Sequence, residues 1–446
     1  MAIQIAQFLL ALSLLIVLHE LGHFIPAKLF KTRVEKFYLF FDAWGKKLIS
    51  YTHKGTTYGI GWIPLGGYVK ISGMVDESMD TDNMGKEPED WEFRAKPTWQ
   101  RLIILSGGVI VNFVLGYLIY ASLLFAYGVD FLPNSELKHG ISTNEIGKSF
   151  GLKNGDKIIS VGSEEVVDFG KIAKSILLGA DGDITIDRNG DIVNIPITDS
   201  LVGFAIANQD LIKSMFMPRV YYKVGGFVDS TSASPAKMAG LQLNDSIVSF
   251  NGSSLAYFDQ YTDSIPEYRN KSVTLGVYRG HELLSLSVPV DSAGRMGVYA
   301  ANLIPSMYNI KHIEYSFGGA MVAAVTKTKG QLQDYVLQFK KLIFRPETKA
   351  YKKVGGFLTM LEQYPTTWDW RSFWELTAFI SLMLGFLNIL PIPALDGGHI
   401  VFVLIEMITG RKPSIKVLEI AQTIGFILLL GLLLFANGND IIRKFF

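Results

Sequence analysis

The pentapeptide His-Glu-Leu-Gly-His at residues 19–23 is the feature that most constrains this chain, because it is an HExxH sequence at the end of an apolar run. Residues four apart share one face of a helix, so His19 and His23 can direct imidazole nitrogens at one zinc ion. Glu20 lies beside them, where it can serve as general base. The preceding residues, 3–18, are nearly all apolar. The pattern predicts a metal site at the end of a membrane helix, where ionisable residues usually have a function; the simpler alternative is a pair of interfacial histidines.

The composition predicts membrane helices combined with soluble domains. Hydrophobic residues make up 49% of the chain and charged residues 19%, which is too apolar for an ordinary soluble protein and too charged for a bundle wholly in lipid. The net charge of +1 gives no attraction to nucleic acid, and no nucleic-acid partner is expected. The sequence has no cysteine, which excludes disulfides and cysteine-ligated zinc. No Lys or Arg precedes Lys28, so a cleavable signal peptide is not predicted.

Four apolar segments are predicted to cross the lipid bilayer. They lie at about residues 3–27, 102–127, 373–390 and 417–435. Lys28, Lys31 and Arg33 follow the first span and no basic residue precedes it, which places the N-terminus outside and HExxH at the cytoplasmic face. Asn112 is the one strongly polar residue of the second span, and we expect it to make an interhelical hydrogen bond. An apolar piece at 399–408 is too short to cross and is predicted to be re-entrant or interfacial.

Residues 34–72, between the first two spans, carry strand residues broken by glycine and proline. The edge of such a sheet, near the metal site, could hold an extended substrate by strand addition. The candidate substrate-binding residues there are Gly66, Gly67, Tyr68, Val69, Lys70 and Ile71. A packed soluble hairpin is an equally open alternative. Residues 73–97 are rich in Asp and Glu and are predicted to form a solvated cytoplasmic loop.

A soluble insertion, residues 129–302, separates the second and third spans and contains an internal sequence repeat. The segment Gly151–Val161 recurs as Gly240–Phe250, each with Gly-Leu, a turn, Asp and a β-rich stretch. A small-residue helix, a turn, an Asp and a strand in this order resemble a PDZ domain. We therefore expect two PDZ-like domains of ordinary size, at 129–219 and 220–305.

The predicted fold is an α-helical membrane protein with four transmembrane helices and a membrane-associated β element. Two tandem PDZ-like α+β domains are inserted between its second and third helices. The first membrane half spans residues 1–128 and the second spans residues 373–446. The intervening residues 306–372 form an amphipathic linker region, because apolar and lysine side chains alternate along 313–343.

A catalytic zinc ion usually has three protein ligands, of which HExxH supplies two. The best candidate for the third is Asp396, in the segment 388–399 after the third span and on the same predicted side of the membrane. Pro391 and Pro393 end the helix before it, and an ionisable residue at membrane depth favours function over a cap or turn. His399 is the second candidate, and is otherwise expected to support the turn or the ligands.

Four motifs together resemble the site-2 protease family of M50-type zinc metalloproteases, in its bacterial regulator-of-sigma-E branch. They are HELGHF at 19–24, IPLGGYVK at 63–70, the tandem PDZ-like insertion, and NILPIPALDGGH at 388–399. Their order matches the family over nearly the whole chain. One departure is Ser106-Gly107-Gly108, where many relatives have Ala-Gly-Pro. It bears on gating and substrate preference rather than on the chemistry.

The resemblance implies a zinc-dependent intramembrane endopeptidase that cleaves single-span membrane proteins within their transmembrane segments, such as a pre-cleaved anti-sigma factor or signal-peptide remnants. It implies one zinc ion per chain, held by His19, His23 and Asp396. Glu20 is then the catalytic residue and Asn388 contacts the substrate. It also implies a multi-pass protein of the bacterial inner membrane, with its active site near the cytoplasmic face. The PDZ-like domains are then periplasmic, where they either bind new C-termini or act as a size filter.

Two other functions compete with a protease. A transporter with a regulatory metal site needs polar midplane residues and repeat symmetry between spans, and the sequence has tandem soluble repeats but no such symmetry. A membrane-anchored PDZ scaffold needs none of His19, Glu20, His23 and Asp396, all of which are present.

Overall fold

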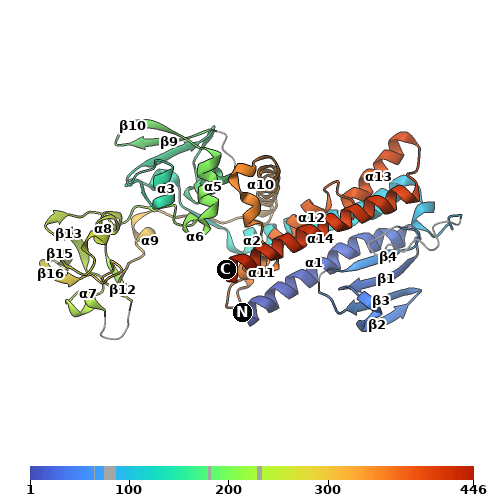
Figure 1. Cartoon of the computed structure of the whole chain (residues 1–446), viewed down its shortest axis with the longest axis horizontal. Helices are drawn as coiled ribbons and strands as arrows, with labels where there is room; N and C mark the ends of the chain where they lie inside the picture. Colours follow the sequence, from blue (N-terminus) through green and yellow to red (C-terminus); the bar gives the residue numbers. More distant parts are fainter. Residues whose placement is uncertain (65, 75–86, 179–181, 229–233, 446) are drawn as a thin grey trace. The chain divides into compact units, whose positions relative to one another are not determined.

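The computed structural model describes residues 1–64, 66–74, 87–178, 182–228 and 234–445, and the chain divides into two compact units (Figure 1). The first unit consists of Met1–Gly128, Glu314–Phe339 and Lys352–Phe446. The second unit consists of Val129–Ile313 and Lys340–Tyr351. Helix α10 (Phe317–Phe344), in the predicted linker region, begins in the first unit and ends in the second.

Three helices among the described residues are long and apolar enough to cross a membrane: α1 (Ala2–Leu29), α2 (Thr98–Tyr127) and α14 (Ile415–Phe445). Their 28, 30 and 31 residues exceed the roughly 20 that a bilayer core requires. They coincide with the first, second and fourth predicted spans. Much of their apolar surface, above all on α14, is exposed, which is unfavourable in water and suits lipid.

Helix α12 (Trp370–Asn388) occupies the position predicted for the third span. It has 19 residues and carries Arg371 and Glu375 in its first two turns, and it is not among the three candidate spans. Its buried face, which includes Phe373 and Leu382, packs along α2. A count of four membrane helices therefore stays a prediction.

Helix α13 (Asp396–Thr409) contains the apolar piece that was expected to be re-entrant or interfacial. With 14 residues it is about 21 Å long and too short to cross a bilayer. It packs against α2, and a buried ion pair joins the two helices, with Arg101 Nη2 2.5 Å from Glu406 Oε1. A short helix, α11 (Phe357–Glu362), precedes α12 and contacts both α1 and α14.

The residues predicted as strands and turns form a four-stranded sheet with the order β2-β3-β1-β4. Its strands are β1 (Val34–Leu39), β2 (Lys47–His53), β3 (Thr56–Gly61) and β4 (Tyr68–Ile71). Strands β1 and β3 are parallel and the other pairs are antiparallel. Strand β4 contacts α1 and is an edge strand among the described residues. Of the predicted acidic loop, residues 75–86 lie outside the described residues.

The second unit contains two lobes, each built on a four-stranded antiparallel sheet and its own apolar core. The first lobe contains β6 (Ile141–Thr143), α3 (Glu145–Ser149), β7 (Lys157–Val161), β8 (Glu164–Glu165), α4 (Ile172–Leu178), β9 (Asp183–Arg188), β10 (Asp191–Pro196), α5 (Asp199–Ala207), α6 (Gln209–Ile212) and β11 (Phe216–Pro218). The second contains β12 (Val224–Phe227), α7 (Pro235–Met238), β13 (Ser246–Phe250), β14 (Ser253–Ser254), α8 (Phe258–Ser264), β15 (Ser272–Arg279), β16 (Glu282–Pro289) and β17 (Val298–Ala300). The unit also contains strand β5 (Val129–Phe131), helix α9 (Ile304–Met307) and strand β18 (Lys311–Ile313), together with Lys340–Tyr351. Strand β18 pairs with β5.

The two lobes contain equivalent ion pairs, and the aspartate of each pair lies in the repeated sequence segment. Asp156 binds Arg188 in the first lobe and Asp245 binds Arg279 in the second, at 2.8 and 2.7 Å. Each aspartate also accepts a backbone N–H three residues upstream, and each arginine also donates to a glycine carbonyl. These partners are Lys153 and Gly151 in the first lobe, and Gln242 and Gly240 in the second. The sheets share one strand order, β10-β9-β7-β8 and β16-β15-β13-β14. Their assignment as PDZ-like domains stays a prediction.

We predict that Asp245→Asn loosens the second lobe and speeds amide hydrogen exchange in β13 and β15 roughly tenfold at neutral pH, because a charge-assisted hydrogen bond is lost. Burial alone would raise the pKa of Asp245, but hydrogen bonds from Arg279 and the Gln242 amide outweigh it and hold the pKa below its ordinary value of 3.8. The stabilisation is therefore present above that value and is lost as the pH falls below it. Asp191→Asn, at an exposed position, is the control. Equal protection in both variants would contradict the prediction.

Candidate metal centre

Two histidines on adjacent turns of α1 form one side of the centre. The ring centroids of His19 and His23 are 4.9 Å apart with the rings nearly perpendicular, and their Nε2 atoms are 3.3 Å apart. His23 Nδ1 lies 2.8 Å from the carbonyl oxygen of Ile104 on α2. A carbonyl only accepts, so this contact fixes the proton on Nδ1 and leaves the Nε2 lone pair free to bind a metal.

Asp396, the first residue of α13, closes the centre from the other end of the chain. Its Oδ2 lies 3.4 Å from Nε2 of both histidines, and the three candidate ligand atoms lie within 4.8 Å of one another. This Oδ2 is buried and has no hydrogen-bond donor among the described residues. Two imidazole nitrogens and a carboxylate oxygen that converge on one point are a donor set that suits zinc. The residues therefore fit the metal that the sequence predicts.

The turn that carries Asp396 is held in a constrained shape. Helix α12 ends at Asn388, before Pro391 and Pro393, and Ala394 adopts the left-handed conformation with φ of +75°. The turn is also covered closely by α14, because a Cβ added to Gly425 would lie 1.7 Å from the Pro393 carbonyl oxygen. Strain of this kind persists where the surrounding structure over-determines it, most often at functional sites.

Glycines allow α1 and α2 to approach at the level of the histidines. A Cβ on Gly22 would lie 2.4 Å from the Gly107 carbonyl oxygen. A Cβ on Gly108 would lie 2.3 Å from His23 Nε2 and 2.6 Å from His19 Cε1. Gly107 and Gly108 thus make the space in which the two rings lie. This departure from the family pattern was expected to bear on gating and substrate preference alone, but it also borders the metal centre.

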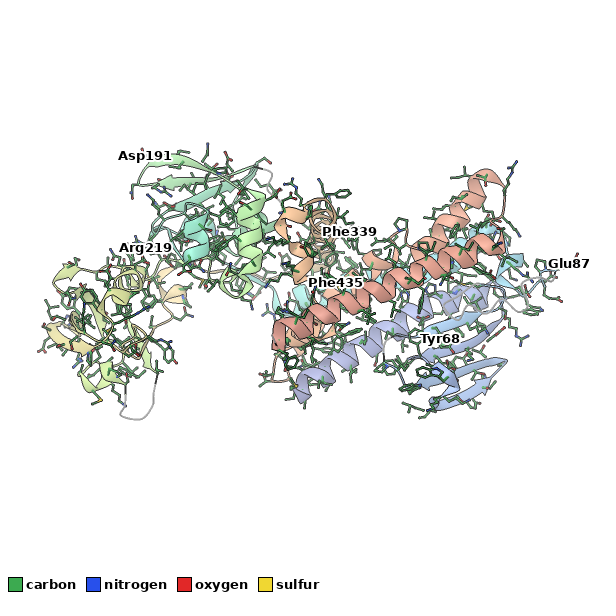
Figure 2. All side chains as sticks on the ribbon, viewed as in Figure 1. Tyr68, Glu87, Asp191, Arg219, Phe339 and Phe435 are labelled. Carbon is green, nitrogen blue, oxygen red and sulfur yellow. The ribbon has the colours of Figure 1, made fainter. Side chains whose placement is uncertain are left out.

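The expected catalytic and substrate-binding residues surround a cavity of about 80 Å³. His19, Glu20, His23 and Asp396 line it, together with Gly67, Tyr68, Val69 and Ile71 at strand β4, and Figure 2 shows Tyr68 on the sheet beside α1. A Cβ at Gly67 would lie 3.5 Å from Glu20 Cγ, so the strand runs directly past this glutamate.

Four other predicted residues differ in where they lie relative to the ligands and the cavity. Asn388 reaches the ligands, with Nδ2 3.4 Å from His19 Nε2. Gly66 and Lys70 are not among the residues that line the cavity, and Lys70 Nζ lies 3.6 Å from a carboxylate oxygen of Glu35. His399, the second candidate ligand, lines the cavity but is not part of the ligand cluster.

Sequence reasoning missed one lining residue and misjudged another. Gln422 of α14 is buried and lines the cavity. It is one of few polar residues in the predicted fourth span, which is the signal that could have found it. Asn112 does make the expected interhelical contact, but its partner is a candidate ligand, because Nδ2 lies 3.1 Å from His19 Nδ1.

An HExxH helix that meets a distant aspartate among apolar helices defines a metallopeptidase centre, and the chain belongs to peptidase family M50, whose family model matches residues 7–432. It is similar to the protease RseP of Yersinia pestis, at 30% identity over 99% of this chain and 98% of that protein. It is also 30% identical to the regulator of sigma-E protease RseP of Salmonella typhimurium, with the same coverage. A Vibrio cholerae protein with the provisional name of zinc metalloprotease is 28% identical over 98% of both chains.

The predicted family is therefore confirmed, and the chain is a zinc metalloendopeptidase of the site-2 protease type with helices suited to an inner membrane. The simpler alternative, that His19 and His23 are only a pair of interfacial histidines, is excluded by membership of this family and not by the HExxH motif alone.

We predict that Gly108→Ala weakens zinc binding, because its Cβ would occupy space that both histidine rings need and the rings must shift to make room for it. Gly431→Ala is the matched control, since a Cβ at this glycine of α14 meets no atom within 4 Å. Zinc content per chain, measured after purification in detergent, separates the two variants. Wild-type zinc content in Gly108→Ala would show that α1 and α2 lie farther apart than they do in this structure.

Proposed function

We propose that this chain is a zinc-dependent endopeptidase that hydrolyses peptide bonds within the transmembrane segments of single-span membrane proteins. The observation that carries the proposal is the convergence of His19, His23 and Asp396 on one point, in a cavity bordered by an edge strand. These three residues would hold one zinc ion per chain. A bound zinc ion supplies a polarised scissile carbonyl and an acidified water.

Glu20 is the general base of the proposed reaction. It follows His19 on α1, lines the same cavity and lies beside the backbone of β4, where a substrate peptide would run. In this position its carboxylate takes the proton of the attacking water and returns it to the departing amine nitrogen. Burial of the site among apolar side chains limits access of other water molecules to the scissile bond.

The edge of β4 is the proposed substrate-binding surface. The backbone groups of a transmembrane helix are bonded to one another, so the substrate must unwind before it can be cut, and the released N–H and C=O groups need new partners. Residues Gly66 to Ile71 offer such partners by strand addition, since β4 is paired only with β1 among the described residues. Asn388, within reach of His19, would hold the substrate backbone next to the metal.

The proposed topology has four membrane helices, with α12 as the third, and the active site near the cytoplasmic face. Basic residues that follow the first span support this orientation. The lobes at 129–219 and 220–305 would then be periplasmic PDZ-like domains. Their role is to bind, or to exclude by size, the outer ends of substrates. The similarity to proteases named as regulators of sigma-E supports a regulatory role. The proposed setting is regulated intramembrane proteolysis, with a pre-cleaved anti-sigma factor or signal-peptide remnants as substrate.

We predict that Glu20→Gln lowers cleavage of a model single-span substrate by roughly 10²- to 10⁴-fold, because the general base is lost. Zinc content should stay at the wild-type level, since Glu20 is outside the ligand cluster. The purified full chain in detergent, with Glu362→Gln at an exposed position as control, measures both quantities. Cleavage at the wild-type rate by Glu20→Gln would contradict the proposed mechanism, in which Glu20 is the general base.

Removal of the metal should abolish cleavage reversibly. We expect a zinc chelator to stop hydrolysis, and activity to return as zinc is restored to one ion per chain, because the centre has a single set of three ligands among the described residues. Activity that persists at a zinc content near zero would contradict a metal-dependent reaction.

A further inference from the structure

Asn112 lies on α2 one turn after Gly108, on the face that meets the two histidine rings. It is fully buried, at 0% exposure. Its side-chain amide is 3.1 Å from Nδ1 of His19, and its backbone oxygen accepts a hydrogen bond of 2.8 Å from Ser381 of α12. Asn112 is therefore held from both sides, with its amide aimed at the ring atom of His19 that does not face Asp396.

The two histidines need the same protonation pattern if both bind one metal through Nε2. His23 has this pattern, because the Ile104 carbonyl accepts a hydrogen bond from Nδ1–H. The Nε2 atom of His19 lies 3.4 Å from Asp396 Oδ2, so its Nδ1 must also carry the proton and needs an acceptor. Among the described residues, Asn112 is the hydrogen-bond partner of this Nδ1.

The Asn112 amide can be that acceptor. Its Oδ1 is buried with no hydrogen-bond partner among the described residues, while Nδ2 faces His19. The oxygen and nitrogen of an asparagine amide have nearly the same shape, so half a turn of the amide places Oδ1 at the 3.1 Å position. Oδ1 then accepts a hydrogen bond from Nδ1–H of His19, and the Nε2 lone pair of that ring faces the side of the centre where Asp396 lies.

We propose that Asn112 is a positioning residue for the metal centre: its Oδ1 accepts a hydrogen bond from Nδ1–H of His19, and so leaves Nε2 of that ring free to bind zinc. This rests on the proposed function, since it requires the zinc site. It assigns Asn112 a role beyond helix packing, because packing alone has no preference for an acceptor at this position.

The experiment uses the full chain in detergent and measures zinc affinity by competition with a chelator, and the visible absorption of the Co²⁺-substituted chain. Asn112→Leu keeps the size of the side chain without an acceptor, and Asn112→Ala serves if the leucine variant does not fold. Asn112→Asp keeps an acceptor but has no donor. Ser381→Ala is the matched control, since it removes a hydrogen bond to the same residue and leaves the amide in place.

We expect Asn112→Leu or Asn112→Ala to weaken zinc affinity by about 10- to 100-fold and to change the Co²⁺ spectrum. Asn112→Asp and Ser381→Ala should both stay within a few-fold of the wild type. Wild-type affinity in the variants without an acceptor would overturn the proposal. So would a loss in Asn112→Asp as large as in Asn112→Leu, which would mean that the amide donates. A wild-type chain that binds no zinc would remove the proposed function, and the role of Asn112 with it.

Discussion

The close crossing of α1 on α2 is the contact on which the rest of the molecule depends. Two imidazoles and a carboxylate are costly to bury among apolar helices unless they are paired or bound to a metal. Glycines at the crossing allow the backbones of α1 and α2 to approach very closely. A Cβ on Gly107 would lie only 1.9 Å from the Gly22 carbonyl oxygen. At that distance α2 can supply both the Ile104 carbonyl to one histidine and the Asn112 amide to the other. Bulkier side chains would separate the rings from these partners.

Asp396, the second half of the centre, is positioned by different contacts. Asp396 follows a turn with a left-handed alanine, and α14 covers the preceding carbonyl through Gly425. The ion pair between Arg101 and Glu406 fixes α13 to α2, the helix that also positions the histidines. One helix, α2, is therefore in contact with both halves of the ligand set, so a change in its position would disturb all three ligands together.

The sequence predicted best the features that depend on local spacing. His19 and His23 follow from the four-residue period of a helix, and three spans follow from apolar length. Asp396 followed from its expected side of the membrane, and the structure brings it to the histidines. The parallel pairing of β1 with β3 and the rotation that aims Asn112 at His19 were not predictable, because long-range packing decides them. Helix α12 resembles a span in position, but Arg371 and Glu375 weaken the signal that length and composition give.

The three proposed ligands lie far apart in the sequence, and this has a consequence for biosynthesis. His19 and His23 emerge from the ribosome early, whereas Asp396 emerges only after the whole second unit has been made. The first membrane half alone has two of the three proposed ligands and only part of the residues that line the cavity. With the proposed ligand set, a nascent chain is therefore inactive until the segment that carries Asp396 has been made. On this proposal, cleavage activity requires the helices that are made last.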